Sequence, residues 1–151
     1  MATQPDFTLY DRYGRLAAVV KVSNTRDTSG EWAAEFRRNL QARGASWHAP
    51  FFLLVTPLRL YVWKEGAQGA EADAVVLPDY ELDPRPLFEP YLPGIGRKLE
   101  GISREAFELL VMSWLGELVF HLPGSSRQAP LEDSGLPEAV KDGRITYPAA
   151  A

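Results

Sequence analysis

Residues 5–24 read PDFTLYDRYGRLAAVVKVSN and contain two predicted strands joined by a short turn. Residues 7–10 alternate between apolar and polar positions, as a half-buried strand does. Residues 11–14 predict a hairpin turn, because Gly14 can adopt a positive φ. The second strand is predicted over residues 15–24, where alternate positions are apolar and the others become polar toward the end. This stretch therefore predicts a β-hairpin with one face in the core.

A helix and two further strands are predicted after the hairpin. Residues 28–30 offer an N-cap for a helix over residues 31–43. Residues 51–56 form a continuous apolar run, which is typical of a central strand. Residues 58–64 alternate between aliphatic side chains and arginine or aromatic side chains, and predict a strand with one exposed face. The order β-β-α-β-β indicates an α/β domain with a mixed central sheet and flanking helices.

The second half of the chain is dominated by one predicted helix over residues 103–121. It is apolar on nearly every side, so it is either buried or part of an interface. Tyr61 and Trp63 share one strand face with Arg59 and are candidates for a partner surface, but we expect them to pack beneath this helix. Gly116 inside the helix indicates close packing there. The helix that carries Trp114 is also the best candidate for forming a homodimer or docking a larger protein.

Two further stretches are rich in proline. Residues 78–93 predict an extended, poorly helical connection. Residues 122–151, rich in proline, glycine and serine, predict a loosely attached tail. The expected organisation is a single domain over residues 1–121 followed by this tail.

Composition narrows the classes of protein that fit. The 151 residues suffice for one domain, and no stretch is long and apolar enough to predict a membrane span or a signal peptide. The absence of cysteine excludes disulfides and thiolate metal sites and favours a cytoplasmic location. The net charge of −4 hides a basic first half, because residues 1–64 carry nine Lys or Arg and only five Asp or Glu. A polyanion would therefore bind in this half.

The hairpin, the helix and the strand pair together resemble the PD-(D/E)XK nuclease superfamily. Over residues 5–64 the chain is most similar to the nuclease-like domains at the N-termini of type I restriction enzyme motor subunits and to related stand-alone proteins. The resemblance implies a restriction-endonuclease-like fold. It also implies a site in which two acids hold Mg²⁺ and a lysine positions or deprotonates the attacking water.

The direct alignment with this family leaves the site incomplete. Asp6 matches the first acid, and the hairpin register places it opposite position 20 or 21, near Lys21 and Ser23. The family pattern has an acid where Lys21 stands and a lysine where Ser23 stands. A cation therefore occupies the place of the metal. This alignment predicts a degenerate protein without a cofactor, which binds nucleic acid or another protein.

A second alignment, shifted by two residues, leaves an active enzyme possible. Lys21 then becomes the catalytic lysine, and the acid missing at Val19 is supplied by Glu35 from the following helix. Asp6 and Glu35 would hold Mg²⁺ in a magnesium-dependent endonuclease. A third alternative is a structural protein that oligomerises through the helix over residues 103–121.

A degenerate protein would bind nucleic acid through arginines around the first helix. Arg37, Arg38 and Arg43 are predicted on its outer side, and Arg26 lies in the loop before it. The competing interpretation is a solvated helix face in which Glu35 pairs with Arg38.

Overall fold

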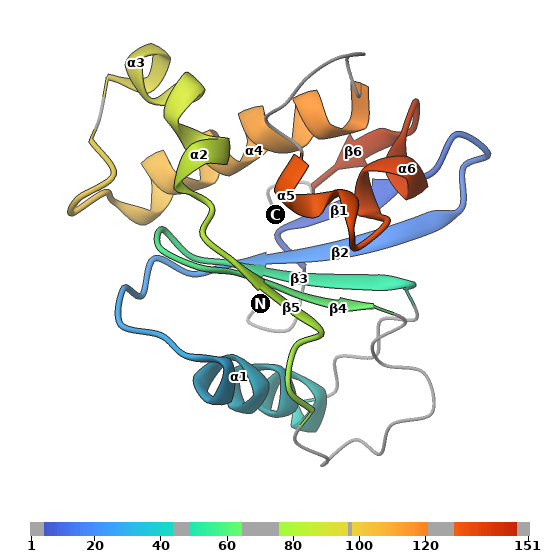
Figure 1. Cartoon of the computed structure of the whole chain (residues 1–151), viewed down its shortest axis with the longest axis horizontal. Coiled ribbons are helices and arrows are strands. Elements are labelled where there is room, and N and C mark those ends of the chain that lie inside the picture. Colours follow the sequence, from blue (N-terminus) through green and yellow to red (C-terminus); the bar gives the residue numbers. More distant parts are fainter. Residues whose placement is uncertain (1–4, 44–48, 65–75, 97, 121–128, 148–151) are drawn as a thin grey trace.

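The computed structural model describes residues 5–43, 49–64, 76–96, 98–120 and 129–147. Its centre is an open, six-stranded mixed sheet in the order β5-β4-β3-β2-β1-β6 (Figure 1). β2 and β3 are parallel, and the other neighbours are antiparallel. The predicted α/β class, with a mixed sheet and flanking helices, is confirmed. The strands are β1 (Phe7–Tyr10), β2 (Leu16–Val22), β3 (Phe51–Val55), β4 (Leu60–Lys64), β5 (Tyr80–Leu82) and β6 (Arg144–Thr146).

The β1–β2 hairpin has the predicted register. Phe7 pairs with Val20, and the Asp6 N–H donates to the Val20 carbonyl at 2.9 Å, which puts Asp6 beside Lys21. The turn closes through Gly14, whose φ of 82° lies in the left-handed region that glycine adopts without strain. The predicted hairpin is therefore present, and it fixes where Asp6 lies.

Helix α1 (Gly30–Ala42) makes the crossover between the parallel strands β2 and β3. It begins where predicted, because the Ser29 hydroxyl accepts a hydrogen bond from the Trp32 N–H. Figure 1 shows α1 alone on one face of the sheet. Beneath it lie Tyr61 and Trp63, both fully buried. The prediction that these two side chains pack under the long C-terminal helix is therefore wrong. Strand alternation separates two faces, but it does not say which helix covers each.

Helix α4 (Arg104–Phe120) covers the other face, together with α2 (Arg85–Phe88), η1 (Glu89–Tyr91) and α3 (Leu92–Ile95) (Figure 1). The long helix is confirmed within one residue of its predicted ends. Trp114 is buried in the core and meets Phe88 edge to face, with ring centroids 5.9 Å apart. Residues 85–95 form short helical turns instead of the predicted extended connection.

The described part of the predicted tail belongs to the domain. Helices α5 (Ala129–Glu132) and α6 (Leu136–Val140) precede β6, which pairs antiparallel with β1. Leu131, Leu136 and Val140 are fully buried in the same core as α4. Residues 129–147 therefore complete the sheet and its cover, contrary to the prediction of a loosely attached tail. Residues 121–128 and 148–151 lie outside the described residues.

None of the described helices is long and apolar enough to cross a membrane.

Candidate functional site

The carboxylate of Asp6 lies at the level of the sheet, at the point where β1 begins. Its Oδ2 accepts the Val22 N–H at 2.7 Å. This side-chain bond follows the backbone bond between Asp6 and Val20, so the carboxylate serves as the next acceptor for β2. One hydrogen bond from the backbone of Asp6 and one to its side chain thereby tie Asp6 to β2.

Lys21 is a buried cation beside this carboxylate. It is 7% exposed, and its Nζ lies 3.9 Å from Asp6 Oδ2. Burial lowers the pKa of the Lys21 ammonium, and the charge of Arg104 lowers it further, while Asp6 and Glu108 oppose the shift. The predicted proximity of Asp6 and Lys21 is therefore present in the structure.

A second cation, which sequence reasoning missed, also reaches Asp6. Arg104, at the start of α4, places its Nη2 3.3 Å from Asp6 Oδ1 and its Nε 3.1 Å from Glu108 Oε1. Asp6 and Arg104 are 98 positions apart in the sequence. No local pattern could have paired them. The site is thus a network of two acids and two bases in which Asp6 lies between two cations.

This arrangement does not fit Mg²⁺. The ion takes carboxylate and water oxygens at 2.0–2.1 Å in near-octahedral geometry. Here both oxygens of Asp6 face cations, and the Lys21 ammonium stands on the strand position where the family resemblance implies an acid. Among the described residues, no group of three or more His, Cys, Asp or Glu side chains is placed to hold a metal ion.

Glu35 is not brought to the site. Its exposed carboxylate lies 3.0 Å from Arg38 Nη2, one turn along α1. The helix lies over β4, where the Arg37 guanidinium sits 5.7 Å from the Trp63 ring centroid. Asp6 instead adjoins β1, three strands away in the sheet. The observed ion pair of Glu35 with Arg38 is the one expected if this side of the helix is simply a solvated face.

Ser23 forms part of the loop after β2. Its hydroxyl is hydrogen-bonded with that of Thr25 at 2.9 Å and accepts the Thr25 N–H at 3.3 Å. This is a local turn of the kind that serine favours at the end of a strand.

The four arginines of the predicted patch differ in their surroundings. Arg37 is 3% exposed and stacks over Trp63, so its prediction on the outer side of the helix is wrong. Arg26 donates to the Leu99 carbonyl at 3.1 Å and ties the loop before α1 to the loop before α4. Arg38 pairs with Glu35, and Arg43 is exposed at the end of α1. Arg37 is therefore not part of an exposed patch, and Arg26 and Arg38 already make contacts within the chain.

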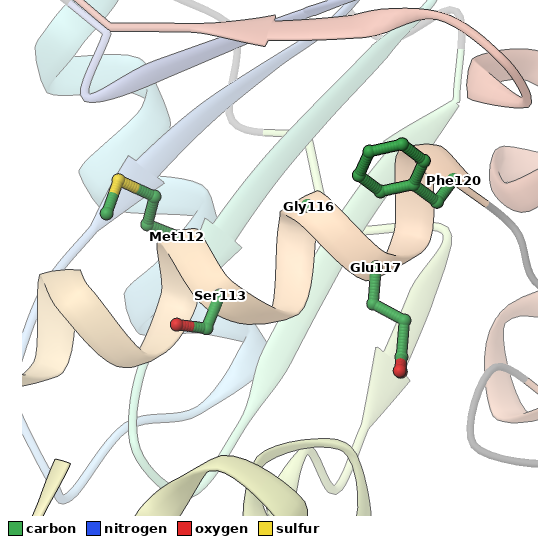
Figure 2. Close-up of a pocket in the computed structure, with 5 residues that line it drawn as sticks. All are labelled: Met112, Ser113, Gly116, Glu117 and Phe120. Atoms are coloured by element: carbon green, nitrogen blue, oxygen red, sulfur yellow. The ribbon is translucent and has the colours of Figure 1, made fainter. Parts of the chain in front are cut away.

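The outer face of α4 is apolar and hollowed. Figure 2 shows Met112 and Phe120 on the same side of the helix, with Gly116 between them. Together with Ser113 and Glu117 they line a depression of about 410 Å³. Phe120 is 74% exposed, whereas Trp114 is fully buried, so a homodimer through this helix could not use Trp114 itself. A Cβ added at Gly116 would meet no atom within 4 Å, which contradicts the predicted close packing.

Comparisons of the chain with protein-family models, with curated proteins and with solved structures gave no match.

Proposed function

We propose that this chain is a catalytically degenerate protein of the PD-(D/E)XK nuclease type, which acts by binding and not by cutting phosphodiesters. The observation that carries the proposal is the pair of cations on Asp6. Lys21 Nζ lies 3.9 Å from one carboxylate oxygen, and Arg104 Nη2 lies 3.3 Å from the other. These cations neutralise the one acid of the family pattern that the sequence keeps.

The electrostatics of the network argue against metal-dependent hydrolysis. A divalent cation entering beside Asp6 would meet the charges of Lys21 and Arg104 within a few ångströms. Burial weakens the screening of the Lys21 charge by water. The one remaining acid, Glu108, already holds the Arg104 guanidinium at 3.1 Å. This balance of charges best supports a protein that does not cleave phosphodiesters.

The proposal is tested by restoring the acid and the lysine that the family pattern has and this chain lacks. The variant Lys21→Glu, Ser23→Lys, Arg104→Ala restores an acid on β2 and a lysine two positions later, just beyond the end of the strand. The N–H of residue 23 still pairs with the Val55 carbonyl, so both side chains should lie on one face. We expect Mn²⁺ or Mg²⁺ to raise the melting temperature of this variant but not that of the wild type. A matched control adds Asp6→Asn to the same variant and should abolish the rise.

The wild type should leave supercoiled DNA intact in the presence of either metal. Metal-dependent cleavage that disappears in Asp6→Asn would overturn the proposal in favour of the active endonuclease. Loss of that cleavage in Glu35→Gln would then identify Glu35 as the displaced acid.

A second candidate function is self-association through the outer face of α4, favoured by the hollow beside the exposed ring of Phe120. Ser113 and Phe120 are seven residues apart, or about 10 Å along the helix. In an antiparallel pair of α4 helices with a two-fold axis near Gly116, each Phe120 would face the partner's Ser113. Such a contact is self-complementary, as a two-fold dimer requires.

Size-exclusion chromatography with light scattering tests this second candidate. A dimer that dissociates in Phe120→Glu, but persists in the control Leu77→Glu, would support it. Leu77 is likewise an exposed apolar residue, and it is not among the residues that line the α4 hollow. A wild-type protein that stays monomeric at high concentration would rule it out.

A further inference from the structure

The turn between β1 and β2 presents an exposed aromatic ring flanked by two arginines. Tyr13 is 73% exposed at the tip. The guanidinium carbons of Arg12 and Arg15 lie 5.9 and 5.2 Å from its ring centroid. In Figure 1 this turn is the blue loop that projects beyond the sheet. An exposed large aromatic at a projecting tip, with cations on it, is a common feature of binding surfaces.

A second tyrosine–arginine pair lies at the base of the turn, where β1 ends at Tyr10. Arg144 of β6 pairs with Tyr10 of β1 in the sheet, and its guanidinium carbon lies 4.7 Å from the Tyr10 ring centroid. The sequence does not predict β6, so it does not predict this neighbour of the turn either. We call the five side chains the tyrosine–arginine patch: Tyr10, Arg12, Tyr13, Arg15 and Arg144.

The patch keeps a positive charge despite two nearby acids. Asp11 pairs with Arg15 at 3.1 Å, and Asp142 lies two residues before Arg144. Among the described residues, neither Arg12 nor Arg144 forms an ion pair, so both guanidinium groups are available to an anion. Three arginines against two aspartates leave a net attraction for phosphate groups.

Hydrogen bonds to the Asp11 carboxylate order the turn at the tip. The Asp11 carboxylate accepts the N–H groups of Tyr13 and Arg15, each at 2.9 Å, and the Arg15 Nε at 3.1 Å. These bonds lower the pKa of Asp11, with the Arg15 backbone N–H as the largest cause, so the carboxylate stays charged. A ring presented on an ordered turn loses less conformational entropy when it binds a partner.

We propose that the tyrosine–arginine patch binds single-stranded nucleic acid, with a base stacked on Tyr13 in place of one of its two guanidinium neighbours and phosphates held by Arg12 and Arg144. This inference rests on the proposed function, because a nuclease-like protein that does not cut would act on nucleic acid by binding it. Rings and guanidinium planes together match unpaired bases and their phosphates. An acidic peptide would use the arginines but offers no flat base to Tyr13, and a duplex keeps its base faces stacked.

Fluorescence anisotropy with a labelled oligothymidylate tests the proposal on the whole chain. We expect Tyr13→Ala to weaken binding by about 5- to 150-fold, the range for removing one base–aromatic stack. Arg12→Glu should weaken binding and reduce the salt dependence by a slope of about 0.7 for each phosphate that the variant no longer neutralises. Lys98→Glu is the matched control, because it removes an exposed cation from the segment before α4 with the same change in net charge, and it should bind as the wild type does.

Three outcomes would overturn the proposal. Tyr13→Ala could bind like the wild type, Lys98→Glu could weaken binding as much as Arg12→Glu, or an acidic peptide could displace the oligonucleotide at equal charge concentration. Displacement by the acidic peptide would indicate that the patch binds a protein partner. Incubating the same samples with Mg²⁺ separates the two proposals. Cleavage of DNA by the wild type would refute the proposed function, whereas uncut DNA that is not bound at the patch would refute the inference alone.

Discussion

Lys21 is the residue on which the interpretation of the site depends. Its amine is buried, lies 3.9 Å from a carboxylate and has a second cation, Arg104, on the far side of that carboxylate. Burying a charge costs free energy that an ion pair offsets only in part. The lowered pKa of Lys21 expresses this balance, because burial outweighs the attraction of Asp6 and Glu108.

This balance predicts how stability depends on pH. Because the pKa of Lys21 is lower in the folded state, the unfolded chain binds more protons in the window below the ordinary lysine pKa of about 10.4. The free energy of unfolding contributed by Lys21 should therefore rise with pH through that window. Urea denaturation at several alkaline pH values should show a rise in the wild type that is absent from Lys21→Met.

The comparison with Lys21→Met also removes the effect of Tyr61. Burial raises the pKa of the Tyr61 hydroxyl, which destabilises the folded state above the ordinary tyrosine pKa in both proteins alike. Parallel pH curves for the two proteins would contradict the assignment of Lys21 as a costly buried cation.

Individual elements are predictable to the extent that their own sequence determines them. The hairpin, the central strand and both long helices follow from local periodicity and end within a few residues of the predicted limits. Arg37 shows where this reasoning fails. It lies outside the stripe of Trp32, Phe36 and Leu40, yet the side of α1 that faces the sheet is shifted toward Ala33. Arg37 is buried there because its cation stacks on Trp63 of β4.

Helix α4 gives a prediction at the scale of an element. Gly116 lies inside the helix with open space around the position of a Cβ. Gly116→Ala should therefore raise the free energy of unfolding by about 1 kcal/mol, since alanine fixes the backbone at a lower entropic cost. Urea denaturation of the two proteins measures this. A loss of stability would show that the position is packed, as the sequence alone predicts.

At the scale of the whole molecule, the pairing of β6 with β1 could not be predicted from the sequence. β6 has only three residues, Arg144–Thr146, and no alternation that separates it from a loop. Its strand conformation comes from pairing with β1, at a sequence separation of 138 residues. The network around Asp6 escaped prediction for the same reason, because Arg104 arrives from another element. Long-range pairings of this kind decide both the sheet edge and the site.

The C-terminal segment should therefore contribute to global stability. Leu136 is fully buried against the core that α4 covers. Leu136→Ala should lower the free energy of unfolding by about 2–5 kcal/mol, because it removes buried methyl groups and leaves a cavity. Glu138→Ala, an exposed change in the same helix, should stay within about 0.5 kcal/mol of the wild type. Equal stability of Leu136→Ala and the wild type in urea would show that the segment is only loosely attached.

The pairing of β6 with β1 also bears on how the protein is made. A ribosome adds about 5–20 residues per second, so the stretch between Thr8 and Thr146 takes roughly 7–28 s to synthesise. Until then the outer edge of β1 has no partner, and its free N–H and C=O groups can pair with another nascent chain. The same edge carries Tyr10, beside the turn proposed to bind nucleic acid. The unpaired edge of β1 in the nascent chain is therefore prone to intermolecular pairing until β6 pairs with it.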